Sequence, residues 1–498
     1  MEKGKKIKAL DGEIPLPESI IQHIQSFLNK KQAAQTALLS KSWRNAWSTS
    51  PNLDLDQRNF PNPGQIAAAF SEFANKTMQR YLESNLKIEK FSLWMKSTEG
   101  DRDPLLANEL ISKALRMGVH DLNFEIHPPI DTFVLPDEVL GAETLIGLSL
   151  IGCKINRPID GKVSCSRLKF LSLRSVYISD DVVCDIISNC PLIESLLLSG
   201  CENVIDIKLP TVSRRTIRIL ALRNPMKKSF EFHNLKSLSL DRLNIDGLFT
   251  HDFCLKFRSL LELTLSHCYC CKRIQISSPS LECITLEKMR MFGAKFDVPN
   301  MQKFKFSGSI FPFLAFSTLS SSEWLSEISI RCMCHHLGGS FFLKLKRFLT
   351  KLSTSKIYLS IVFPLEMEIY SVGDLRGLPR PVVENLMLSV NSSSSVRCAV
   401  LDGLFRSFRP KVINQYWFPR SYVAEKANNE LLELLCRTLM QQASRDCCIY
   451  FGLSDLEEVN VEIFEETVRE WGPLPWKTLL DASTTSPEYT RKIRFQLR

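Results

Sequence analysis

Two dense groups of cysteine and histidine have the clearest potential for chemistry in this sequence. They are Cys268, Cys270 and Cys271, and Cys332, Cys334, His335 and His336. Thiolate and imidazole groups bind zinc, which takes four tetrahedral ligands, commonly from cysteine pairs two to four residues apart. The single-residue gap between Cys268 and Cys270 is too tight for such a pair. Packed or surface thiols are therefore expected, a structural metal stays the alternative, and no residue is assigned as a metal ligand.

Other patterns that support catalysis are missing from the sequence. It contains no phosphate-binding glycine loop, no H-E-x-x-H and no G-x-S-x-G. A cysteine and a histidine can still meet by chance, but a nucleophile also needs a base and a third, orienting group. The sequence therefore predicts no enzyme activity, no catalytic residue and no cofactor.

The sequence pattern of residues 14–56 is the strongest local signal in the chain, and it predicts three short helices. Leu16-Pro17 gives a rigid entry, because proline fixes φ and is tolerated where a helix starts. A first apolar stripe at helical spacing follows: Ile20, Ile21, Ile24, Phe27 and Leu28. Further helices are expected over 31–39 and 40–48, the last with Trp43 and Trp47 on one side. So small a bundle hides little apolar surface, and the surplus is expected to face a partner. Packing against the rest of the chain is the alternative.

This stretch resembles an F-box. The matching positions are Leu16, Pro17, Ile20, Ile24, Leu28, Ala33, Ala34, Leu39, Ser40, Lys41, Trp43, Arg44 and Trp47. The departures are polar, at Glu18, Gln35 and Ser42, and none removes an apolar anchor. The resemblance implies that the segment binds the Skp1 adaptor of a cullin-RING ubiquitin ligase. The residues that it assigns to that contact are Leu16, Pro17, Ile20, Ile24, Leu28, Ala34, Leu39, Ser40, Trp43, Arg44 and Trp47.

A second pattern, L-x-x-L-x-L-x-x-C with other apolar residues allowed, recurs from about residue 88. Its clearest copies begin at Leu145, Leu168, Ile193, Leu235, Leu260 and Leu281. Weaker copies begin at Ile217, Met301 and Leu325, and with them the start-to-start spacing from Leu145 is 18 to 25 residues, as in leucine-rich repeats. Within each copy two apolar residues lie two apart, on one side of a short strand, and stacking of the coils then forms a parallel sheet. Three cysteines at one register are expected in the core: Cys153, Cys201 and Cys268.

The strand positions between the apolar residues are expected on the concave face of the sheet. They include Ser149, Ser172, Leu197, Ser239 and Thr264. Because these are small and mostly hydroxylated, the concave face is expected to carry few charges. A pocket for an anionic small ligand such as an inositol phosphate, or for a hormone, is therefore disfavoured.

Two segments, residues 133–153 and 190–201, resemble repeats of plant-type F-box/leucine-rich-repeat proteins. The resemblance covers about residues 14–350 and implies an α/β fold. It consists of an N-terminal three-helix F-box followed by a leucine-rich-repeat solenoid, a horseshoe with a parallel sheet on its concave face. The pattern fades beyond residue 330. The strand-like triplets expected there are Ile357-Leu359-Ile361, Val383-Leu386-Leu388 and Leu456-Val459-Val461. A helix is expected over 428–442, and an apolar cap from Trp471, Trp476, Leu479 and Leu480.

The predicted order of domains follows from these segments. It is a basic disordered tail (1–13), the F-box (14–56), a helical connector (57–87), the solenoid (88–390), irregular last repeats with a helix (391–463), and a C-terminal cap with a basic tail (464–498).

Composition and charge limit the remaining possibilities. The net charge is +9, but +7 of it lies in residues 1–8 and 491–498, which favours solvated tails over a specific nucleic-acid groove. No run of 18 apolar residues predicts a membrane span. Sixteen cysteines without a secretion signal predict reduced thiols, in the nucleus, the cytoplasm or both. Nuclear import through Lys3, Lys5, Lys6 and Lys8 is an open alternative.

The leading functional hypothesis is a non-catalytic adaptor that binds a Skp1-like protein and, through its repeats, an unknown target protein. One alternative is a Skp1-associated scaffold or binding protein without a role in ubiquitination. Another is a co-receptor for a small ligand or hormone.

Overall fold

The computed structural model describes most of the chain. The described residues are 16–28, 30–60, 66–96, 103–127, 133–156, 163–201, 234–242, 245, 257–270, 273–317, 323–333, 335–364, 367–369, 372–375, 377–390, 393–415, 434–435, 458–465, 470–473 and 493–497. The contacts divide the chain into two compact units, the first within 1–193 and 201–213 and the second within 194–200 and 214–498. Within the described residues, no helix is both long and apolar enough for a membrane span.

The first unit opens with the three predicted helices. They are α1 (Glu18–Ser26), α2 (Lys30–Thr36) and α3 (Lys41–Ser48). A strand, a short 3-10 helix and a long helix follow: β1 (Asn52–Asp56), η1 (Gln57–Asn59) and α4 (Ile66–Glu83). The hydroxyl of buried Tyr81 on α4 donates a 2.8 Å hydrogen bond to the carbonyl of Ser50, between α3 and β1. This contact ties the helical trio to the rest of the unit.

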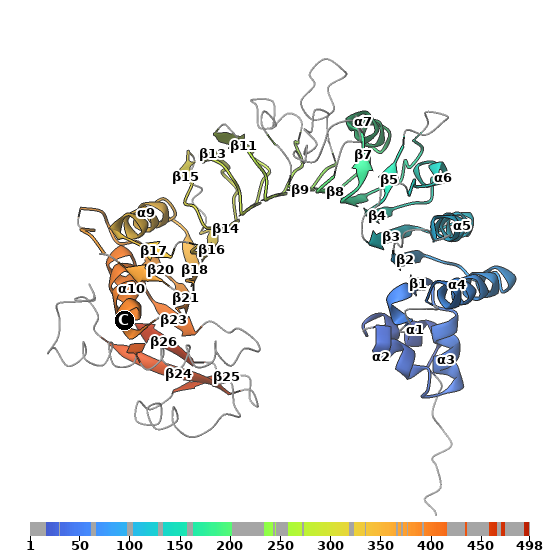
Figure 1. The fold of residues 1–498 in the computed structure, drawn as a ribbon, viewed down its shortest axis with the longest axis horizontal. Coiled ribbons are helices and arrows are strands. Elements are labelled where there is room, and N and C mark those ends of the chain that lie inside the picture. Colours follow the sequence, from blue (N-terminus) through green and yellow to red (C-terminus); the bar gives the residue numbers. More distant parts are fainter. Residues whose placement is uncertain are drawn as a thin grey trace, which may run out of the picture. The chain divides into compact units, whose positions relative to one another are not determined.

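A parallel sheet forms the centre of the first unit. Its strands pair in register from β1 onward: β2 (Lys90–Lys96), β3 (Asp121–His127), β4 (Gly147–Ile151) and β6 (Phe170–Arg174). Every second side chain is buried, as the period of a strand requires. The sheet therefore already begins inside the segment predicted as F-box. The returning chain contains α5 (Asp103–Arg116), α6 (Asp137–Leu140), β5 (Lys154–Ile155), β7 (Tyr177–Ile178) and α7 (Asp180–Asn189). Figure 1 shows α4, α5 and α6 on one side of these strands.

The second unit continues the same arrangement of strands. Its parallel strands are β8 (Ser195–Ser199), β9 (Ser237–Asp241), β10 (Glu262–Ser266), β12 (Cys283–Glu287), β14 (Lys303–Gly308), β16 (Leu325–Arg331), β18 (Lys356–Val362), β21 (Asn385–Ser389) and β23 (Val412–Gln415). A second, smaller parallel sheet lies on the returning side: β11 (Ile274–Ser277), β13 (Gly293–Asp297) and β15 (Phe313–Phe316). Toward the C-terminus helices replace it: α9 (Gly339–Thr350) and α10 (Ser394–Ser407). Two short strand pairs complete this part: β17 (His336–Leu337) with β19 (Glu368–Ile369), and β20 (Val382–Val383) with β22 (Arg409–Pro410).

The apolar positions of the predicted repeat fill the core of both units. In the copy that begins at Leu145, the residues Leu148, Leu150 and Cys153 are all buried with it. The later triplets Ile357-Leu359-Ile361 and Val383-Leu386-Leu388 are buried as well. The copy at 217–222 lies outside the described residues.

A left-handed residue follows many of these strands and turns the chain away from the sheet. These left-handed residues are Gly152, Ser175, Gly200, Arg242, His267 and Lys288, all with positive φ. In the second unit the amide of such a residue donates to the last carbonyl of the next strand, as from His267 to Glu287 at 2.7 Å. Left-handed backbone is uncommon outside glycine, so the repeated hydrogen bond is what holds Arg242, His267 and Lys288 in this conformation.

The last strands differ from the prediction. The strands β24 (Val459–Glu465), β25 (Glu470–Pro473) and β26 (Ile493–Leu497) pair antiparallel, and β26 also pairs antiparallel with β23. Val459 and Val461 were expected to continue the parallel repeat, and that expectation was wrong. The predicted boundary at 463 falls inside β24, and residues assigned to the basic tail form β26 instead. Arg494 in β26 bonds to Glu462 and lies 4.3 Å from the Trp471 ring, so it is not a solvated tail residue. Trp476, Leu479, Leu480 and most of the helix expected over 428–442 lie outside the described residues.

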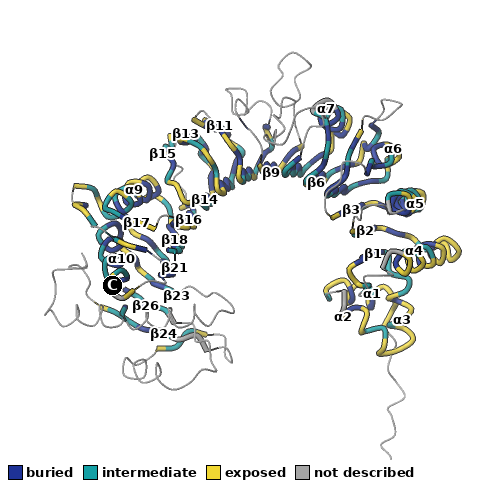
Figure 2. Tube along the Cα trace, in the orientation of Figure 1, coloured by how far each residue is buried: buried dark blue, intermediate teal, exposed yellow. Residues whose placement is uncertain are grey.

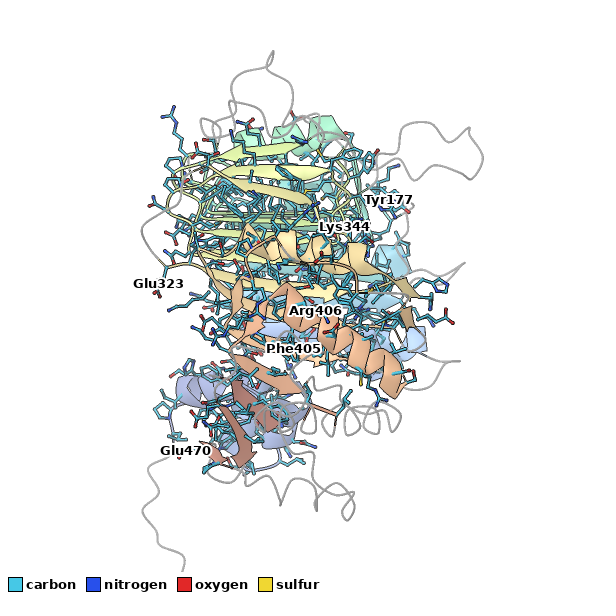
Figure 3. All side chains as sticks on the ribbon, turned by 90° about the vertical axis from the view of Figure 1, so that its left-hand side faces the viewer. Tyr177, Glu323, Lys344, Phe405, Arg406 and Glu470 are labelled. Carbon is cyan, nitrogen blue, oxygen red and sulfur yellow. The ribbon has the colours of Figure 1, made fainter. Side chains whose placement is uncertain are left out.

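Helices α9 and α10 pack closely because one position between them is glycine. A Cβ added at Gly403 would lie 2.4 Å from ring carbons of the buried Phe342. Beside this contact, the ammonium of buried Lys346 donates a 2.7 Å hydrogen bond to the carbonyl of Leu375. Figure 3 shows Phe405 and Arg406, which belong to α10.

We expect Gly403→Ala to lower the free energy of unfolding by about 1–3 kcal/mol, because the added methyl group overpacks a filled helix contact. Chemical denaturation measures this change. Gly141→Ala is the matched control, since its Cβ meets nothing closer than 3.6 Å and its φ of −91° suits alanine. Equal stability of the two variants would contradict the packing argument.

Candidate functional site

Helices α1, α2 and α3 form a small bundle that two glutamine side chains hold together. The amide of Gln25, buried on α1, donates to the hydroxyl of Thr36 at 2.8 Å and to the carbonyl of Trp43 at 3.2 Å. The amide of Gln22 donates to the hydroxyl of Thr49 at 3.1 Å, and Thr49 also bonds to Glu18. The apolar interior consists of Ile21, Ala33 and Ala46. With so few buried apolar groups, these hydrogen bonds set the arrangement of the three helices.

Most apolar side chains of the bundle lie on its outside. They are Leu16, Ile20, Ile24, Phe27, Leu38, Leu39 and Trp47, which we call the apolar surface. Leu38 is 80% exposed and Phe27 is 76% exposed, whereas Trp47 is 40% exposed. In Figure 2 the exposed residues of these helices are coloured yellow. Clusters of this kind on an otherwise ordinary soluble fold mark sites of protein–protein interaction.

The predicted binding residues fall into two groups. Exposed ones are Leu16, Pro17, Ile20, Ile24, Ala34, Leu39, Ser40, Arg44 and Trp47. Leu28 and Trp43 are half-buried. Ser40 also has a structural role, because its hydroxyl caps α3 by accepting from the amide of Trp43 at 3.4 Å. Pro17 precedes the first turn of α1, where its carbonyl accepts from the amides of Ile20 and Ile21.

Sequence reasoning left Phe27 and Leu38 out of the site, although they are the two most exposed members of the apolar surface. Phe27 belonged to the predicted apolar stripe of the first helix, and Leu38 to the helix expected over 31–39. Phe27 caps the C-terminal end of α1, and Leu38 lies in the turn after α2. A side chain at a helix end or in a turn is harder to bury in a small bundle. Their positions at the expected ends of these helices could therefore have predicted that Phe27 and Leu38 are exposed.

The cysteine groups do not assemble into a metal site among the described residues. No group of three potential metal-binding side chains occurs there, while Cys271 and Cys334 lie outside those residues. Cys268 is buried, and its thiol donates to the carbonyl of Leu240 at 3.3 Å. Burial raises the pKa of the Cys153 and Cys190 thiols to about 12 and that of Cys165 to about 11. The thiol, not the reactive thiolate, is therefore the stable form of these residues at neutral pH.

The open face of the main sheet carries more charge than the sequence suggested. The quoted positions Ser149, Ser172, Leu197, Ser239 and Thr264 are all half-buried, as expected for small side chains. The same register continues through Lys305 and Glu327, so the expectation of few charges was wrong for the later strands. These charges are paired, since Glu327 lies 2.6 Å from the ammonium of Lys303 and 3.6 Å from that of Lys305.

Comparison with known families decides what the helical bundle is. Residues 15–55 match the F-box domain, and residues 107–224 match the family described as FBD-associated F-box protein At5g56370, LRR repeats. The chain carries an F-box and leucine-rich repeats. The sequence-based resemblance to plant-type F-box/leucine-rich-repeat proteins is thus confirmed, as is the α/β fold with its mainly parallel sheet.

Several relatives come from Arabidopsis thaliana. F-box/LRR-repeat protein At4g14096 is 31% identical over 240 residues, which are 46% of this chain and 47% of that protein. F-box/LRR-repeat protein At4g14103 is 32% identical over 241 residues, 46% of this chain and 59% of that protein. F-box/FBD/LRR-repeat protein At1g80470 is 24% identical over 301 residues, 53% of this chain and 63% of that protein. The chain thus matches about half the length of these relatives.

We expect Gln25→Ala to loosen the F-box, because it leaves the Trp43 carbonyl and the Thr36 hydroxyl without this donor. A missing hydrogen bond of this kind costs about 1–3 kcal/mol. Amide hydrogen exchange should therefore speed up about tenfold or more across residues 16–50. Gln35→Ala, at an exposed position, is the control and should leave exchange unchanged. Equal exchange in both variants would show that Gln25 does not hold the bundle.

We expect Cys153, Cys165 and Cys190 to resist a thiol reagent such as iodoacetamide at pH 8 while the protein is folded, because their thiolates are scarce and buried. Denaturant should expose them all. Cys398, which is half-buried, serves as the internal comparison. Mass spectrometry after timed alkylation gives the rate at each position. Labelling of Cys153 in the folded protein as fast as in denaturant would contradict the burial.

Proposed function

We propose that this protein is the substrate-recognition subunit of an SCF-type E3 ubiquitin ligase. In this proposal the F-box binds a Skp1-like adaptor, and through it a cullin-RING ligase, while the repeats bind a target protein. The observation that carries the proposal is the apolar surface of α1–α3, which remains exposed although the bundle has formed its own interior from Ile21, Ala33 and Ala46.

The apolar surface suits an adaptor because its members come from separate elements that meet on a rigid support. Ile20 and Ile24 lie one turn apart on α1. Leu39 lies in the turn after α2, and Trp47 lies on α3. Large apolar and aromatic side chains dominate the energetics of protein interfaces when a partner removes them from water. Burial of Leu38 and Phe27 would add to this effect, since they have the most exposed area to lose.

The proposed role needs no catalytic residue in this chain. A ligase adaptor accelerates ubiquitin transfer by holding the target close to the loaded enzyme, so that the reaction becomes effectively unimolecular. We therefore assign the protein a non-catalytic function. Its buried, high-pKa thiols at Cys153, Cys165 and Cys190 agree with packing, because an activated nucleophile needs a lowered pKa or an adjacent base.

We expect Leu38→Asp to weaken binding of a Skp1-like adaptor at least tenfold, because a charge then enters the contact. Leu16→Ala with Pro17→Ala should have a similar effect. Isothermal titration calorimetry with purified Skp1 gives the dissociation constants. Leu105→Asp on α5 is the matched control, since Leu105 is 72% exposed but lies outside the F-box. Undiminished binding by Leu38→Asp and by the double variant would refute the assignment.

A scaffold that binds Skp1 without presenting a target is the main rival. Reconstitution of the full ligase with a protein captured by the repeats separates the two. Ubiquitin transfer to that protein, lost in Leu38→Asp but kept in Leu105→Asp, is expected for the proposed function. Normal Skp1 binding with no transfer would favour the scaffold.

A further inference from the structure

A second exposed apolar surface lies in the repeats of the second unit. It follows the carboxyl ends of β10, β12, β14 and β16, where the chain leaves the main sheet. Its apolar members are Tyr269, Phe292, Ile310, Phe313 and Met333, which with the cations named below we call the rim. Phe292 is 76% exposed and Met333 is 67% exposed. Neighbouring strands lie about 4.8 Å apart, so four of them give the rim a length of about 14 Å.

The rim residues are neighbours in space as well as in the pattern. Tyr269 and Arg290 form a backbone bridge, and the amide of Phe313 donates to the carbonyl of Phe292 at 3.2 Å. Along 288–292 the exposed residues alternate with half-buried ones, which places Lys288, Arg290 and Phe292 on one side of an extended segment. The left-handed conformation of Lys288 at the end of β12 starts this segment.

Gly293 opens the rim to a cation–π contact. Gly293 pairs with Phe313 in register, Arg273 directly precedes β11 on the other side, and the guanidinium carbon of Arg273 lies 5.4 Å from the Phe313 ring centre. A Cβ at Gly293 would lie 2.5 Å from the Phe313 carbonyl. Only glycine lets the strands meet this closely, so the rim presents an aromatic ring and a guanidinium together.

The rim members carry only positive charge, although the exposed Glu287 precedes Lys288 and Asp241 lies 3.0 Å from His267. Its cations are Arg273, Lys288, Arg290 and Arg331, all exposed. The described rim segments 267–270, 288–293, 309–313 and 331–333 contain no aspartate or glutamate. By contrast, lysines elsewhere in this unit pair with carboxylates, as Lys303 does with Glu327, Lys411 with Glu384 and Lys236 with Glu194. Among the described residues, no carboxylate forms a salt bridge with the four rim cations.

We propose that the rim binds an extended acidic segment of a target protein, in which carboxylates alternate with large apolar side chains. The carboxylates would pair with Arg290, Arg273 and their neighbours, and the apolar side chains would cover Phe292, Ile310 and Met333. About four residues of extended chain span the rim at 3.3 Å each. The assignment of this segment to a ligase target rests on the function proposed above.

A protein segment fits the rim better than a nucleic acid does. Single-stranded nucleic acids bind to cationic grooves lined with aromatic rings, on which successive bases stack. Here the rings of Tyr269 and Phe292 follow β10 and β12, whereas the aliphatic side chains of Ile310 and Met333 follow β14 and β16. Aliphatic side chains contribute by burial and offer no stacking platform, so an amphipathic peptide uses all members of the surface.

Fluorescence anisotropy with the full chain tests the proposal. The probe is a labelled nine-residue peptide that alternates glutamate with phenylalanine and leucine. A second peptide carries lysine in place of glutamate, and a labelled nine-nucleotide oligouridylate is the third probe. We expect the glutamate peptide to bind at least tenfold more tightly than the lysine peptide, and more weakly as salt rises. Equal binding of the two peptides, or a preference for the oligouridylate, would overturn the proposal.

Variants locate the binding site. Arg290→Glu with Arg273→Glu should remove the preference for glutamate, and Phe292→Ser should weaken binding severalfold. Lys236→Glu with Lys411→Glu makes the same change of charge at paired lysines away from the rim, and it should leave binding unchanged. Unaltered binding by both rim variants would also overturn the proposal. Skp1 binding, measured on the same variants, should stay normal. Its absence already in the wild type would instead refute the function proposed for the F-box.

Discussion

The in-register parallel pairing of short strands is the constraint on which the rest of the structure depends. Each strand buries every second side chain, such as Leu148 and Leu150 in β4, and leaves the others on the open face. A single coil has too little apolar surface to fold alone, so each coil is stable only against its neighbours. The sheet starts at β1, so only residues 49–51 separate the last F-box helix from the stack of strands.

Both proposed binding surfaces consist of side chains that this packing does not use. In the F-box, Ile21, Ala33 and Ala46 fill the interior, and the large side chains of the apolar surface remain exposed. In the second unit, the left-handed His267 and Lys288 turn the chain away after β10 and β12, and the rim side chains that follow stay exposed. The open face of the sheet differs, because its Lys303 and Lys305 both lie next to the carboxylate of Glu327.

Periodicity in the sequence predicted most of the fold, since amphipathic helices and repeated strands leave strong patterns. It did not predict β1, because the five residues NLDLD are too short to separate a strand from a loop. It also missed the antiparallel direction of β24, since alternation at Val459 and Val461 indicates a strand but not its partner. The charges on the later strands were missed because the earlier strands were taken as typical.

Local periodicity likewise predicted only part of the candidate site. Helical spacing placed Ile20, Ile21 and Ile24 on one stripe, but it could not tell which of them faces the bundle. Ile21 is buried while its two neighbours are exposed, and that outcome depends on α3 contacting α1. Contacts between residues more than 20 positions apart are not contained in local periodicity.

The strand β26 covers one side of β23, the last parallel strand described in the main sheet. Unpaired strand edges recruit other chains and promote aggregation. Loss of only residues 493–498, through a premature stop codon or trimming by a protease, would uncover that edge even though no proposed binding residue is lost. Such shortened forms would therefore fail through self-association rather than through loss of recognition.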